Sequence, residues 1–180
     1  MKQNKNVTLY NILLPIWMLI FFPTPLWLIL IPGNYLIDRF ILKWSLGDMA
    51  EKGMFCRKHT WKICLVGFIS DFIGAVLLFS LFMIFAQVKD ESMFKTFLDQ
   101  IEYGIGFNPF SNILGLIIIL LSIACAGGLI YFFDHKILIK AGLTKAQAKK
   151  SALYLAVFTA PYLYLFPSEL LYQELVHLLI

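Results

Sequence analysis

Residues 61–79, WKICLVGFISDFIGAVLLF, combine an apolar run with a single acid near its centre. The run continues to Ala86, and its part from Ile63 onward has the roughly 20 residues that a helix needs to cross a hydrocarbon core of about 30 Å. The whole chain has the same character, with 60% hydrophobic and 14% charged residues among 180. This composition is too apolar for an ordinary water-soluble domain, and it predicts one integral membrane domain over residues 1–180.

Two further apolar runs, Ile113 to Phe133 and Ser151 to Phe166, also have the length of a membrane span. A fourth apolar region, Tyr10 to Trp44, is at about 35 residues too long for one straight span. It contains a Pro-Thr-Pro sequence at 23–25. Because proline removes a helical hydrogen bond and clashes with the preceding turn, the sequence predicts a proline-broken hairpin with its tip at 23–25.

The charges between the apolar runs indicate which loops face the cytoplasm. Residues 43–62 carry five bases and two acids, and residues 134–150 carry five bases and one acid. Residues 89–111 carry two bases and four acids. Because basic loops stay on the cytoplasmic side, the first two segments are expected inside, together with the N-terminus and its Lys2 and Lys5. The acidic segment and the C-terminal tail are expected on the outer side of the cell membrane.

These placements predict an all-α, polytopic bundle of four or five membrane segments. Five are favoured, with residues 10–44 forming two arms of which the short first one crosses or re-enters. The alternative has four segments and an N-terminus outside. Two amphipathic stretches, residues 91–102 and the tail after Pro167, are expected to lie at the outer interface. In the first of them, one helical face carries the apolar residues Phe94, Phe97, Leu98 and Ile101.

Asp71 is the clearest candidate for a functional residue. At about 15 Å from the inner end of its predicted helix, it lies near the middle of the bilayer. An acid at that depth is costly unless it is protonated, paired or hydrated, and it is by default a functional-site hypothesis. Asp71 shares a face with Gly67, Ser70 and Gly74, so another helix can approach it closely. The alternative is a structural acid that pairs with Arg39 or with a neighbouring hydroxyl.

A second group of polar residues lies on the returning arm of the predicted hairpin. Asp38 follows Asn34 by one helical turn, so the two form a polar stripe. A helix break at Pro32 and Gly33 is expected to free backbone carbonyls beside this stripe, as happens where broken helices line a cavity. Arg39 is close enough to the inner surface to extend its guanidinium toward the headgroups. The stripe is therefore predicted to line an internal polar site or to pair with the acid of the second run.

Motifs for catalysis or metal binding are missing from the sequence. There is no H-E-x-x-H, G-x-S-x-G or Walker sequence. The cysteines, Cys56, Cys64 and Cys125, form no C-x-x-C pair and are expected to be free thiols. Ser122 with Ala126, and likewise residues 124 and 128, have the spacing of small-residue helix contacts. We therefore expect no enzyme, no cofactor and no metal site.

The sequence favours a small transport or permeation protein. The expected solute is a proton, a cation or a small polar molecule, bound by Asp71, Asp38, Arg39, Asn34 and Ser70. The alternative is a non-catalytic accessory or regulatory subunit of a membrane complex. The expected partners are the lipid bilayer and, because the inner segments are rich in lysine and arginine, anionic lipids at the cytoplasmic face. A second copy or a partner membrane protein is an open alternative, and nucleic acid is not expected.

Overall fold

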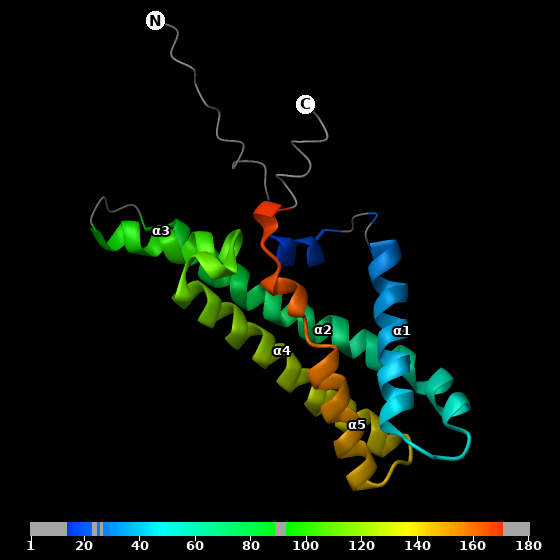
Figure 1. The fold of residues 1–180 in the computed structure, drawn as a ribbon. Helices are drawn as coiled ribbons and strands as arrows, with labels where there is room; N and C mark the ends of the chain where they lie inside the picture. Colours follow the sequence, from blue (N-terminus) through cyan, green and yellow to red (C-terminus); the bar gives the residue numbers. More distant parts are fainter. Residues whose placement is uncertain (1–13, 23–24, 26, 89–92, 171–180) are drawn as a thin grey trace, which may run out of the picture.

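The computed structural model describes residues 14–22, 25, 27–88 and 93–170, and within them every regular element is a helix (Figure 1). This confirms the all-α prediction for the described part of the chain. The elements are, in order, η2 (Ile16–Ile20), α1 (Trp27–Ser45), α2 (Lys52–Ala86), α3 (Met93–Gly106), η3 (Pro109–Ser111), α4 (Ile113–Lys140), α5 (Lys145–Phe158) and η4 (Tyr162–Leu165).

Two of these helices, α2 and α4, are long and apolar enough to cross a membrane. They have 35 and 28 residues. Both are longer than the sequence predicted: α2 begins at Lys52 rather than near Trp61, and α4 continues past Phe133 to Lys140. Apolar runs indicate which part of a helix avoids water, and charged residues with good helix propensity extend the helix beyond that part.

Small residues bring α2 and α4 into close contact. A Cβ atom added at Gly74 would lie 3.2 Å from Ser122 Oγ and 3.4 Å from Ala126 Cβ. The Ser122 hydroxyl also donates a hydrogen bond to the Gly74 carbonyl, at 2.8 Å. One of the two predicted small-residue pairs therefore makes the helix contact. The other pair, Ala124 and Gly128, is exposed.

A tight turn returns the chain from α4 to α5. The amide of Leu143 donates to the carbonyl of Leu138 at 3.1 Å, across Gly142, whose φ is +98°. This is a Schellman ending, which favours glycine because its backbone is left-handed. Thr144 then caps α5 in a capping box with Gln147. As a result α5 runs back alongside α4 (Figure 1).

The two ends of the bundle differ in how the chain is arranged (Figure 1). At the loop end, residues 46–51 and 141–144 connect α1 to α2 and α4 to α5. Four helices form a continuous core there, which we call the loop-end core; its buried residues are Ile41, Leu42, Leu46, Cys56, Ile63, Ile130, Leu138, Leu143, Ala148, Ala152, Leu155 and Ala156. At the opposite end, the α3 end, η2 and η4 lie beside α3.

The described part of the first arm is a short 3-10 helix, η2, at the α3 end. The indole of Trp17 donates to the carbonyl of Ile105 at 2.8 Å, and the amide of Ile16 donates to Ser168 Oγ at 2.8 Å. Three consecutive side chains of η2 are buried, which one face of a spanning α-helix does not allow. The structure therefore does not show the predicted hairpin. Residues 1–13 and the predicted tip residues Pro23 and Thr24 lie outside the described residues.

The predicted break at Pro32 and Gly33 is wrong, because α1 continues through both residues. Pro32 lies in the second turn, where its missing N–H removes a single hydrogen bond to the carbonyl of Leu28. The other backbone bonds continue the helix. The polar stripe of Asn34 and Asp38 therefore lies on a continuous helix and not beside an unwound segment.

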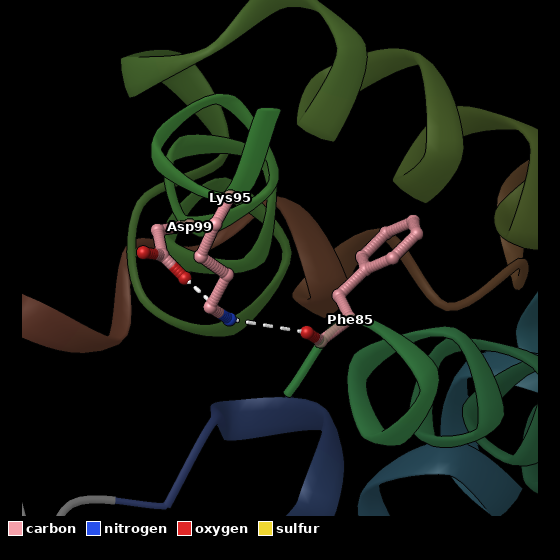
Figure 2. A network of polar contacts seen from close by, with 3 residues as sticks. All are labelled: Phe85, Lys95 and Asp99. Atoms are coloured by element: carbon pink, nitrogen blue, oxygen red, sulfur yellow. Dashed lines mark hydrogen bonds and ion pairs between the residues drawn. The ribbon is translucent and has the colours of Figure 1, made fainter. Parts of the chain in front are cut away.

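The amphipathic stretch predicted at residues 91–102 corresponds to α3, as expected. On its apolar face Leu98 is buried and Phe94 is exposed. Figure 2 shows how α3 is attached to the end of α2: Lys95 Nζ donates to the carbonyl of Phe85 at 3.2 Å and pairs with Asp99 Oδ1 at 2.7 Å. A cation at the C-terminal end of α2 also offsets the partial negative charge of the helix dipole.

Candidate functional site

Two polar stripes predicted from distant parts of the sequence meet around one cavity of about 130 Å³. We call it the acid cavity. Helix α1 contributes Asn34 and Asp38 to its wall, and α2 contributes Asp71. The remaining lining residues are Ile37, Cys64, Gly67, Phe68, Phe158, Thr159 and Ala160. Gly67 keeps the cavity open, since no atom lies within 4 Å of the position that its Cβ would take.

Asp38 lies at one side of the acid cavity and is only 5% exposed. The side chains of Cys64 and Thr159 are in hydrogen-bond contact with its carboxylate. Thr159 has a single hydroxyl proton, and its hydroxyl also donates a hydrogen bond to the Leu155 carbonyl at 2.8 Å. The Leu155 carbonyl and the Asp38 carboxylate therefore compete for one proton.

Asp71 lies within electrostatic range of Asp38, and the two carboxylates repel each other when both are ionised. Its Oδ1 atom is buried and has no hydrogen-bond partner. Its backbone carbonyl accepts a hydrogen bond from the Tyr164 hydroxyl at 2.6 Å, which holds this turn of α2 against η4. A buried carboxylate oxygen without a donor is unfavourable on its own, so the site is suited to a proton or a positively charged group.

A second cavity, of about 220 Å³, adjoins the first toward the α3 end. We call it the aromatic cavity because Trp17, Trp27, Phe68, Tyr162 and Tyr164 line it, together with aliphatic residues of η2 and η4. It shares its wall with the acid cavity at five positions: Asn34, Phe68, Asp71, Thr159 and Ala160. Asp71 therefore faces both cavities.

A break in the last predicted span contributes Thr159 and Ala160 to the shared wall. The sequence predicts one run from Ser151 to Phe166, but α5 ends at Phe158 and the chain resumes as η4 at Tyr162. Pro161 cannot donate to a carbonyl of the preceding turn, and it restricts Ala160 to non-helical conformations. The C-terminal end of α5, with its partial negative charge, consequently points into the region of the two acids.

Asp134 is a third buried acid, which the sequence analysis assigned to an inner loop. It is 0% exposed, and neither carboxylate oxygen has a hydrogen-bond partner. It lies in α4 one turn from Ile130 and one turn from Leu138, both in the loop-end core. Its carboxyl group is close enough to Asp38 for the two to interact electrostatically. The signal for its burial was present in the apolar residues four positions before and after it, but the basic residues that follow outweighed that signal.

The five predicted site residues separate into two groups. Asn34, Asp38 and Asp71 line the acid cavity. Ser70 is buried but donates to the Val66 carbonyl of its own helix at 2.8 Å, and it lines neither cavity. Arg39 is half-buried, its charge acts on Cys56, and within the described residues no ion pair joins it to Asp38 or Asp71.

Cys64 and Thr159 were missed as site residues. Each resembles an ordinary residue of an apolar helix in the sequence, and only the meeting of α2 and α5 brings them to Asp38. The comparisons with known proteins add no residue assignment: no family model, curated protein or solved structure matches the chain.

Proposed function

We propose that this chain is an integral membrane protein that moves a proton or a cation through the acid cavity. The observation that carries the proposal is the position of Asp71, an acid that lines both cavities and forms no ion pair with a lysine or arginine among the described residues. Asp38 adds a second negative charge, and the end of α5 adds a partial one. Discontinuous helices with their carbonyl ends at a polar site are a recurring feature of cation sites in transporters.

We propose four crossings, made by α1, α2, α4 and the broken α5–η4 segment. Because η2 and the start of α1 both lie at the α3 end, the residues between them need not cross the membrane. The loop end carries exposed bases of α2, α4 and α5 and is proposed to be cytoplasmic, in contact with anionic lipids. Single cysteines at Asp48 and Phe110, both exposed, should label from opposite sides of the membrane.

The alternative proposal, an accessory subunit without transport, requires that the buried polar groups satisfy one another. The unpartnered oxygens of Asp71 and Asp134 do not favour it. We propose no catalytic activity, and the transport hypothesis takes precedence because Asp71 lines two cavities that leave room for a cation beside it.

The test is flux into proteoliposomes that contain the purified full-length chain. A potassium gradient with valinomycin sets the membrane potential, and internal dyes report protons or sodium. The wild-type chain should conduct at least one of these ions above empty liposomes, and Asp71→Asn should abolish the flux. Asp48→Asn, at an exposed acid in the loop after α1, is the matched control and should conduct as the wild type does. Equal flux in Asp71→Asn and the wild type would refute the proposal.

A further inference from the structure

We infer that the two adjoining cavities form a binding site for an amphiphilic organic cation, with its ammonium group beside Asp71 and its apolar part in the aromatic cavity. The inference deepens the proposed function, on which it rests for the entry of a cation to Asp71. It assigns a class of ligand to a site that the proposed function leaves open to any cation.

The size of the aromatic cavity suits an organic group. A cavity of about 150 Å³ in a protein interior is known to hold benzene. The aromatic cavity, at about 220 Å³, is larger than that and lies next to the acid cavity. A single ring on a short chain fits this space, whereas an inorganic ion would leave most of it empty.

The aromatic walls are held in fixed positions. Trp27 stacks on Phe68 with ring centroids 6.4 Å apart and an interplanar angle of 18°, and its indole donates to the carbonyl of Leu19 at 3.1 Å. Trp17 is held by its bond to Ile105, and Tyr164 by its bond to Asp71. Rigid aromatic faces attract alkylammonium groups and pack against apolar rings without first having to be ordered.

The charge lies at one end of this space. Asp71 is in the wall that the two cavities share, so an ammonium group beside it leaves the rest of the ligand on the aromatic side. No lysine or arginine in the described part of the chain forms an ion pair with Asp71. An ammonium group in this space would therefore be the opposite charge that Asp71 lacks among the described residues.

The arrangement of the acids suits a metal ion less well. Metal sites for hard cations use several oxygen ligands around one point. Residues 14–88 and 93–170, as far as they are described, hold no group of three or more His, Cys, Asp or Glu placed to bind one metal ion. Asp38 is also already in contact with Cys64 and Thr159. An ammonium group needs fewer ligands, and aromatic rings can replace part of its hydration.

The experiment compares two ligands of nearly equal shape, 2-phenylethylammonium and 2-phenylethanol, by calorimetry. The full-length chain in detergent micelles is titrated at pH 7, with protein-free micelles as the blank. The wild-type chain should bind the cation roughly tenfold or more tightly than the alcohol. Asp71→Asn should remove this preference, and the control Asp48→Asn should keep it. Phe68→Leu should weaken the binding of both ligands to a similar extent, since it removes an aromatic wall and no charge.

Two results overturn the inference. One is equal affinity of the wild-type chain for the cation and the alcohol, a comparison that needs no variant to fold. The other is an unchanged preference for the cation in Asp71→Asn. If either occurs while Asp71→Asn still abolishes proton or sodium flux, the inference fails and the proposed function stands. If the cation binds through Asp71 but no tested cation crosses the liposome membrane, the proposed function fails and the binding site stands.

Discussion

Asp71 and Asp134 are both acids in the two helices that could span a membrane, yet their surroundings differ. Asp71 lines two cavities, and the residues after the end of α5, Thr159 and Ala160, line both of them as well. Asp134 is completely buried between Ile130 and Leu138, with neither carboxylate oxygen partnered. The comparison teaches that burial of an acid does not by itself identify a site. What distinguishes Asp71 is room for a ligand beside the carboxylate.

The largest expected difference between the two acids is in ion flux. We expect Asp71→Asn to abolish proteoliposome flux, because it removes the ionisable group that lines both cavities. Asp134→Asn should keep most of the wild-type flux, since Asp134 lines neither cavity. The measurement is the initial rate per reconstituted molecule. If Asp134→Asn abolished flux as completely as Asp71→Asn, the distinction between the two acids would be lost.

The opposite order is expected for stability. A buried polar group without a partner destabilises the fold by about 1–3 kcal/mol, and more when it is charged. Asp134→Asn avoids the extra cost of a buried charge at nearly constant volume but leaves an unpartnered polar group, so it should raise the free energy of unfolding by about 1 kcal/mol, the low end of that range. Asp71→Asn should raise it by less than Asp134→Asn does, because only one oxygen of Asp71 is buried without a partner and the residue lines two cavities, whereas both oxygens of Asp134 are buried. Unfolding in mixed micelles measures both values. A loss of stability in Asp134→Asn would mean that Asp134 accepts a favourable contact in the folded protein.

Two glycines of α2 test whether the open and the packed regions differ as described. Gly67→Ala should be neutral or raise stability by up to about 1 kcal/mol, because alanine is the better helix former. Gly74→Ala should lower stability by about 1 kcal/mol, since its Cβ would come within 3.2 Å of Ser122 Oγ and disturb the bond to the Gly74 carbonyl. Thermal unfolding of the two variants in one detergent provides the comparison. Equal effects at both positions would contradict the difference in packing.

The smallest expected effect concerns Arg39 and Asp71. Removing one partner of a buried ion pair lowers the free energy of unfolding by about 3–5 kcal/mol, and removing both partners recovers much of that loss. Since the structure shows no such pair among the described residues, the stability changes of Asp71→Asn and Arg39→Gln should add to within about 0.5 kcal/mol. A double-mutant cycle in detergent measures the coupling. Strong non-additivity would favour the accessory-subunit alternative.

Much of the site could be predicted before the helices were placed. Asn34 and Asp38 share a face by their spacing of four residues, and Asp71 is conspicuous in an apolar run, so both stripes follow from sequence period and chemistry. Asp134 could not be recognised in the same way. Five bases follow it before residue 151, and a charge count cannot tell where a helix leaves the apolar region.

The break between α5 and η4 shows another limit of the sequence. Pro161 was visible within the predicted run from Ser151 to Phe166, just as Pro32 was visible within α1. One proline ends a helix and the other does not, because Pro32 lies near the start of its helix and removes one hydrogen bond there. The outcome depends on position within the helix and on the packing of the following segment.

By itself, the sequence determined that the chain is helical, which runs avoid water, and that Asp38 and Asp71 are acids in apolar surroundings. These properties are local, since they depend on residue type and on a period of 3.6 residues. Only the tertiary structure decided that the two acids share a cavity, that Thr159 and Cys64 join them, and that Arg39 does not. Such contacts join residues far apart in the chain, and they depend on how closely the helices approach and where one of them stops.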